Sequence, residues 1–179
     1  MYNYNQYAKT YPQYFMLHKS LPKGYTQQKY IKANRKQYIN TELSIEVGDK
    51  INVQCVPLLG KTGVLFTVFG PGKGQIIITT SREFQGVKNM GVEVVKQNPF
   101  IITGTALEGI NGLLALCRAF TNNKPVFEGD IYNLNVMRDN QIIMNLIACL
   151  DDKGVPCLYD IINEKTYYSN TDTPFLKGE

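Results

Sequence analysis

The sequence predicts an all-β protein: an antiparallel β-sandwich preceded by an extended N-terminal arm. Three observations lead to this prediction. Short runs of β-branched and aromatic residues alternate apolar with polar positions, and turn residues separate them at intervals of about 8–12 residues. No segment shows the sustained apolar spacing of a long amphipathic helix. We therefore divide the chain into an arm at residues 1–20 and a sandwich domain at residues 21–179.

The predicted arm is a strip of aromatic residues set among Asn, Gln and Lys. Its tyrosines recur every two to four positions, so no single helical or strand period fits them. A tyrosine offers apolar area and a polar tip at low entropic cost, which suits contact with another protein. The alternative is a plain disordered tail, although such tails are usually poor in aromatics. The residues assigned to partner binding are Tyr2, Tyr4, Tyr7, Tyr11, Tyr14 and Phe15.

Positive charge is concentrated at the N-terminal end of the chain. Residues 1–41 contain seven Lys and Arg and no acidic residue, whereas the remainder contains twelve basic and fifteen acidic residues. This positively charged end could bind an acidic protein surface or a polyanion. Its electrostatic field alone does not distinguish these two partners. Nucleic acid is the less favoured partner because the net charge is only +4. A predicted basic rim on the first hairpin consists of Lys29, Lys32, Arg35 and Lys36.

The strands are expected in the following order. Two short strands within residues 25–43 flank a polar turn at Ala33-Asn34. Further strands are expected at residues 42–47, 50–59, 63–70, 75–80, 91–97 and 100–107, with a loop at 86–91. Residues 113–120 could form a strand or a helix, and a turn follows at 121–125. Two hairpins complete the chain, one at residues 130–150 around an Asp139-Asn140 turn and one at 155–169, with a turn at 151–154 between them.

Alternation within these strands predicts which side chains face the core. Residues two apart on one strand share a face, so one face of each strand should be buried. The triplets assigned to the core are Leu43, Ile45, Val47; Ile51, Val53, Cys55; and Tyr132, Leu134, Val136.

The four cysteines are expected to be reduced and mostly buried. The sequence contains no CxxC pair, and four cysteines are too few for the disulfide density of a small secreted domain. They are Cys55, Cys117, Cys149 and Cys157. Cys149 and Cys157 could face each other across neighbouring strands, but their spacing does not decide this. The chain opens without the apolar stretch of a secretory signal, and no run approaches the ~20 apolar residues of a membrane span. We expect a soluble protein made in a cytoplasm.

Two segments of the chain together resemble a known family. Residues 21–43, LPKGYTQQKYIKANRKQYINTEL, resemble the opening of concanavalin A-like (laminin-G-like) jelly-roll domains. Residues 129–178 are similar to the family's ending, through Gly154-Val155-Pro156-Cys157, Tyr159-Asp160, Tyr167-Tyr168, Asn170 and Phe175. The matching positions of the first segment are Leu21, Pro22, Gly24, Tyr25, Thr26, Gln27, Tyr30, Ile31, Gln37, Tyr38, Ile39 and Thr41. The order of the two segments implies a domain whose first and last strands meet in one sheet.

The resemblance implies a structural role in a phage particle. Domains of this family are common in phage virion proteins, so we expect a virion-surface head fibre or capsid-decoration subunit that is made in the host cytoplasm. Its implied partners are other capsid or fibre proteins and copies of itself, with a trimer favoured. The alternative is a carbohydrate-binding module for host-surface glycans, as in tail fibres. The basic stretch at Ala33–Lys36 and Pro174 depart from the family pattern, and the short middle weakens any transfer of sugar or calcium binding.

Catalytic chemistry finds little support in the residues, so no enzyme and no cofactor is expected. A glycosidase needs two convergent carboxylates. The nearest candidate is Glu128-Gly129-Asp130, which we interpret as a solvated loop. His18, the one histidine, lies in the arm, which argues against a histidine-based metal or nucleophile site. Asp151-Asp152 and Asp139-Asn140 could offer oxygen ligands to calcium, but they lack the spaced carboxylates of a dedicated calcium loop and are better explained as turns. The glycine-rich segment 70–74 lacks the GK[ST] of a phosphate loop.

Overall fold

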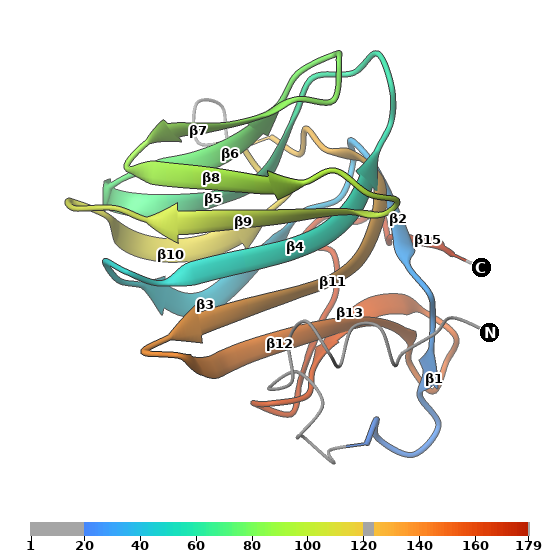
Figure 1. Cartoon of the computed structure of the whole chain (residues 1–179). Helices are drawn as coiled ribbons and strands as arrows, with labels where there is room; N and C mark the ends of the chain where they lie inside the picture. The colour runs from blue at the N-terminus through green and yellow to red at the C-terminus, as the bar shows by residue number, and fades with distance from the viewer. Residues whose placement is uncertain (1–19, 120–123, 179) are drawn as a thin grey trace.

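Two antiparallel β-sheets pack face to face in the computed structural model, which describes residues 20–119 and 124–178 (Figure 1). The larger sheet contains β1 (Thr26–Gln27), β2 (Ile31–Asn34), β4 (Lys50–Pro57), β8 (Met90–Val95), β9 (Phe100–Ala106), β11 (Glu128–Arg138), β12 (Gln141–Leu150), β13 (Pro156–Asp160), β14 (Lys165–Tyr167) and β15 (Leu176–Lys177). The smaller sheet contains β3 (Ile39–Ile45), β5 (Gly63–Gly72), β6 (Gly74–Ile78), β7 (Phe84–Lys88) and β10 (Asn111–Leu116). The prediction of an antiparallel β-sandwich is confirmed.

The chain passes repeatedly from one sheet to the other. The main path of the larger sheet runs β14-β13-β12-β11-β4-β9-β8, and the smaller sheet runs β3-β10-β5-β6-β7. Consecutive strands β3, β4 and β5 therefore alternate between sheets, as do β9, β10 and β11. The core lies between the two sheets, where the predicted triplet Ile51, Val53 and Cys55 is fully buried.

The two ends of the described chain meet in the larger sheet, as the order of the two similar segments implied. β12 pairs with β11 only along residues 133–138, and β2 takes the place of β12 beside residues 128–131. β1 pairs with the far end of β12, and β15 pairs with the outer edge of β2. The first strands thus fill the wedge where β11 and β12 separate.

A close approach between the sheets depends on a glycine. Gly104 lies on β9 between Ile51 of β4 and Val92 of β8, and a Cβ at this position would overlap the edge of the Phe66 ring. Phe66, on β5 of the opposite sheet, is fully buried. Because Gly104 has no side chain, the phenyl ring of Phe66 can occupy the space that a Cβ would fill.

Several sequence predictions are confirmed in detail. Asp139 and Asn140 have φ values of 49° and 62°, which is the backbone of a primed two-residue hairpin turn. The predicted turn within residues 151–154 is present, and residues 161–164 form the turn of the last predicted hairpin. Residues 111–116 form a strand rather than a helix, because β10 lies between β3 and β5 and hydrogen-bonds to both.

Other predictions of local structure are wrong. Ala33 is buried within β2, opposite Gly129, and the chain turns instead at Arg35, whose φ is 65°. Val47 is 59% exposed because it lies in the turn before β4. Residues 86–88 belong to β7, so the predicted loop is a strand.

Two assignments on β11 are also corrected. The register against β4 shifts between Ile131 and Asn133, so Ile131 joins Leu134 and Val136 in the core. Tyr132 does not belong to this series of core residues. It is half-buried and packs against Tyr30, with 5.2 Å between ring centroids. Residues 128–130, predicted as a solvated loop, form the beginning of β11.

Candidate functional site

The first described residues, 20–28, are fastened to the outer side of the larger sheet. The Tyr25 N–H donates to the Pro22 carbonyl at 3.1 Å, which closes a turn at Lys23-Gly24. Thr26 and Gln27 then pair with Leu150 and Cys149 of β12. The chain that precedes residue 20 therefore joins the sandwich at a fixed place, beside β12 and β13.

A small hydrophobic cluster beneath this segment is separate from the main core. We call it the outer cluster: Cys149, Cys157 and Tyr159, which are buried, with Leu21, Tyr25, Ile147 and Ile161 packed against them. The Tyr25 and Tyr159 rings meet edge to face, 5.6 Å between centroids at 61°. The Tyr25 hydroxyl also hydrogen-bonds Thr166 Oγ1 at 2.9 Å. Leu21 and Tyr25 therefore hold the N-terminal segment down over β12 and β13.

The two cysteines of the outer cluster lie directly opposite each other on β12 and β13. Their sulfur atoms are 3.4 Å apart, and both residues are fully buried free thiols. The hydrogen bond from Cys157 lowers the pKa of the Cys149 thiol, although burial opposes this effect. The same hydrogen bond, together with burial, raises the pKa of Cys157. Cys149 is therefore the member of the pair that ionises first.

 An open hollow lies beside the outer cluster. Its volume is about 610 Å³. The hollow is lined by residues 20–23 and by Tyr159, Ile161 and Glu164. Leu21, Tyr159 and Ile161 belong to both the hollow and the outer cluster, so the hollow borders the cluster that contains the two thiols.

The turn after β12 is built around a buried carboxylate. Asp151 Oδ1 accepts hydrogen bonds from the N–H groups of Lys153 and Val155 at 2.9 and 2.8 Å, and the Tyr168 hydroxyl donates to Oδ2 at 2.8 Å. Burial by itself raises the pKa of Asp151, but these hydrogen bonds and the charge of Lys153 outweigh it and hold the pKa below its ordinary value. The turn packs on the N-terminal segment, since a Cβ on Gly24 would lie 3.0 Å from Asp152 Cβ.

The predicted basic rim lies on β2 and its flanking turns. Lys29, Arg35 and Lys36 are exposed, whereas Lys32 is half-buried, with its ammonium 5.4 Å from the centre of the Tyr30 ring. Lys32 stands opposite Asp130 in register, which reduces the positive field there.

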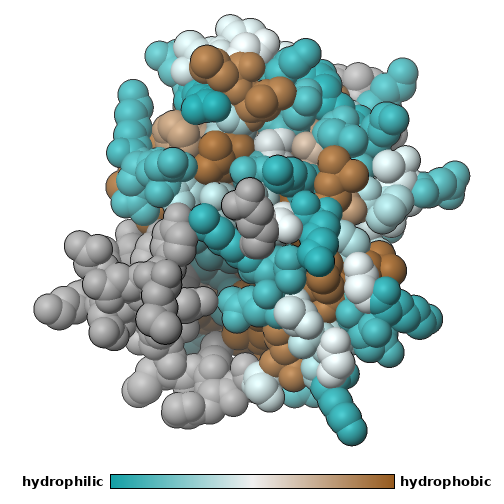
Figure 2. Space-filling view, turned by 90° about the vertical axis from the view of Figure 1, so that its right-hand side faces the viewer, coloured by the Kyte–Doolittle hydropathy of each residue, from teal (hydrophilic) through white to brown (hydrophobic). Residues whose placement is uncertain are grey.

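The rim is also held in place by its neighbours. The Arg35 guanidinium donates to the Thr62 carbonyl at 2.9 Å. β15 adds an exposed lysine, Lys177, beside Ile31. The side of the sandwich that carries β2 and β15 is mainly hydrophilic, with small separate hydrophobic patches (Figure 2). The aromatic residues assigned to the arm, and His18, lie outside the described residues.

A row of polar side chains crosses the larger sheet. Thr103, Asn52, Asn135 and Asn145 are successive register partners on β9, β4, β11 and β12. Thr103 Oγ1 donates to Asn52 Oδ1 at 2.6 Å, and Asn52 Nδ2 donates to Asn135 Oδ1 at 3.0 Å. In the adjacent row Asn133 Nδ2 donates to Gln54 Oε1 at 2.7 Å. We call these two rows the amide rows; they offer several donors and acceptors on one face.

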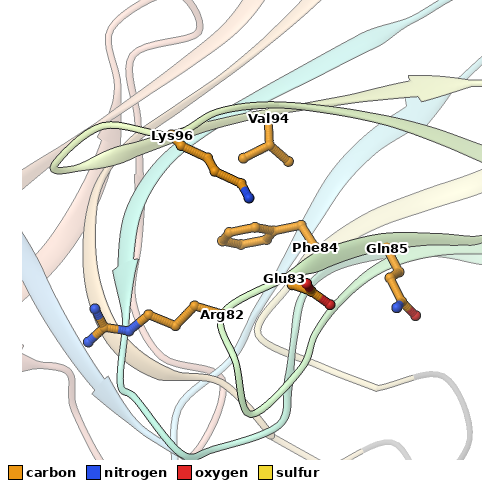
Figure 3. A pocket seen from close by; sticks show the side chains of 6 residues that line it. All are labelled: Arg82, Glu83, Phe84, Gln85, Val94 and Lys96. Carbon is orange, nitrogen blue, oxygen red and sulfur yellow. The ribbon is translucent and has the colours of Figure 1, made fainter.

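The pocket of about 260 Å³ lies where the edges of the two sheets come together, between β7 and β8 (Figure 3). Phe84 forms its apolar floor and packs on Phe100, with 5.6 Å between ring centroids. The Lys96 side chain runs toward the phenyl ring, while the Arg82 guanidinium points away from it (Figure 3). The remaining lining residues are Glu83, Gln85 and Val94. This lining can contact a small ligand, but it contains no pair of convergent carboxylates.

Among the described residues, no group of three or more His, Cys, Asp or Glu side chains is placed to hold a metal ion. Within residues 20–119 and 124–178, no helix has the length and hydropathy needed to cross a membrane. The chain matches no protein-family model, no curated protein and no solved structure in the comparisons with known proteins.

Sequence reasoning missed the outer cluster and the amide rows. The polar members of β4 and β11 do alternate with core residues, so their position on the outer face could have been inferred. Their alignment into rows depends on the register between strands distant in sequence, for which the sequence carries no direct signal.

Proposed function

We propose that this chain is a non-catalytic attachment module of a phage particle, a head-fibre or capsid-decoration subunit with a laminin-G-like jelly-roll fold. The fold part of the proposal is supported by the two antiparallel sheets and by the repeated passage of the chain between them. The role itself rests on the resemblance of residues 21–43 and 129–178 to such domains, which is an analogy of sequence.

The observation that carries the attachment role is the fastening of residues 20–28. Leu21 and Tyr25 pack on the outer cluster, and β1 joins β12, so a load on the N-terminal arm would pass directly into the larger sheet. The arm supplies tyrosines and lysines without acids, and the basic rim lies on the next strand. Together they favour an acidic protein surface as the partner.

The test is deletion of residues 2–19 from the chain. We expect the shortened protein to fold, because every residue of the outer cluster remains, and to lose its association with purified particles. Mass spectrometry of the particles measures incorporation, and thermal unfolding measures folding. A matched control replaces the five arm tyrosines with Phe, which keeps the rings and should retain incorporation. Full incorporation of the shortened protein would show that the arm is not the attachment element.

The second candidate is a carbohydrate-binding module, which the amide rows favour. Asn and Gln side chains can donate to and accept from sugar hydroxyls. Replacing Asn52 and Asn133 with Ala should abolish binding on a glycan array, while Asn111→Ala on the smaller sheet should leave it unchanged. An array with no bound glycan at millimolar concentration excludes this candidate.

A further inference from the structure

We propose that Cys149 and Cys157 are a disulfide-forming site that locks β12 to β13 beneath the N-terminal segment. The two residues are register partners on adjacent antiparallel strands. Directly opposed residues have Cα atoms about 4.5–5.5 Å apart, within the range of about 4.4–6.8 Å that a disulfide spans. The sulfur atoms, 3.4 Å apart, need to approach by little more than an ångström to reach bonding distance.

The rest of the chain provides an internal comparison. Cys55 and Cys117 are also fully buried free thiols, but they lie in the main core between the sheets. Burial raises the pKa of both, and the neighbouring charge of Cys117 adds to the effect on Cys55. Cys149 instead has a lowered pKa and belongs to the outer cluster, three of whose members, Leu21, Tyr159 and Ile161, line the hollow. The outer pair should therefore react before the core pair.

The reaction with oxidised glutathione proceeds in two steps. Cys149 loses its proton and attacks one sulfur of the oxidant, which releases one glutathione thiolate and leaves a mixed disulfide. Cys157 then loses its proton and attacks Cys149 Sγ, which releases the second thiolate. The two protein thiols are oxidised to one disulfide, and one oxidised glutathione is reduced to two molecules of glutathione.

Leu21 and Tyr25 control access to this site. Both side chains pack on the cluster that contains the two buried thiols, and Leu21 also lines the hollow, so we expect an oxidant to reach Cys149 when this segment lifts away. Once formed, the disulfide would hold the strand to which β1 pairs. Its value in strengthening the attachment point rests on the proposed function, whereas its formation does not.

The experiment oxidises the full chain with a graded ratio of oxidised to reduced glutathione. We expect a loss of two hydrogen masses and a rise in Tm of about 5–10 °C, reversed by dithiothreitol. Trypsin cleaves after Lys153, between the two cysteines, so the disulfide joins the peptides 139–153 and 154–165. Tyr25→Ala should accelerate oxidation several-fold, and Cys157→Ala should stop at the glutathione adduct.

Three results would overturn the proposal: no mass loss in a chain that stays folded, a disulfide between Cys55 and Cys117 instead, or a stable glutathione adduct as the only product of the unaltered chain. The measurement uses free protein, so its failure is distinguishable from failure of the particle-incorporation experiment. If Tyr25→Ala fails to fold, the redox titration of the unaltered chain still decides whether the disulfide forms.

Discussion

The side-chain amide of Gln37 donates a hydrogen bond to the main-chain carbonyl of Pro174 at 2.8 Å and so ties the first hairpin to the C-terminal tail. Its Oε1 accepts from the Asn34 N–H at 2.9 Å, and the residue is fully buried. Asn170 reinforces this junction by accepting from the Asn40 N–H at 2.6 Å. The beginning and the end of the described domain are therefore joined through the side chains of Gln37 and Asn170.

We expect Gln37→Ala to destabilise the protein by about 2–4 kcal/mol, because it empties a fully buried side-chain position and leaves a part-buried N–H and a part-buried carbonyl without these partners. Urea denaturation measures the change in the free energy of unfolding. Gln85→Ala, at an exposed position on β7, is the control and should stay within about 0.5 kcal/mol. A loss below about 1 kcal/mol for Gln37→Ala would mean that water replaces the lost hydrogen bonds.

The contact between Gly104 and Phe66 predicts a compensating pair of substitutions. Gly104→Ala should cost about 1–3 kcal/mol, because the added methyl overlaps a buried ring. Phe66→Leu alone leaves a cavity and is also destabilising. The double variant should lose less free energy of unfolding than the sum of the two single variants, because the smaller side chain makes room for the methyl. Strict additivity in denaturation experiments would contradict this packing.

The pKa of Asp151 predicts a pH dependence of stability. A carboxyl whose pKa is lowered by folding stabilises the folded state above its unfolded pKa of about 3.9, and this stabilisation is lost as the pH falls through the folded pKa. Asp151→Asn should therefore be less stable than the unaltered protein at pH 7, and the difference should shrink below about pH 4. Asp152→Asn, at an exposed neighbouring position, is the control. A difference in Tm that is constant from pH 7 to pH 3 would refute the role of the ionised carboxylate.

Local patterns predicted the strands well because apolar alternation and turn chemistry act within a few residues. The Asp139-Asn140 turn and the buried triplet of β4 are examples. The assignment of Tyr132 failed because a register shift between Ile131 and Asn133 changes which side chains face the core. Such a shift depends on the partner strand, here β4, rather than on the residues of β11 themselves.

Sites that depend on long-range pairing were correspondingly harder to predict. The spacing of Cys149 and Cys157 left their pairing open, since only the register of β12 and β13 decides it. The cover provided by Leu21 and Tyr25 depends on how β1 enters the sheet. The basic rim lies on β2 and its flanking turns, but its neighbour Asp130 comes from a strand about a hundred residues later.

The exposure of the basic rim predicts a charge-dependent contact that can be measured without the natural partner. Replacing Lys29 and Lys36 with Gln should lower the salt concentration at which the full chain elutes from a polyglutamate surface, because both ammonium groups are exposed and separate from the core. The matched control replaces Lys61 and Lys96, which are also exposed, and so removes the same charge elsewhere. Equal shifts for the two double variants would show that net charge, rather than the rim, governs the contact; a larger shift for Lys29 and Lys36 assigns it to the rim.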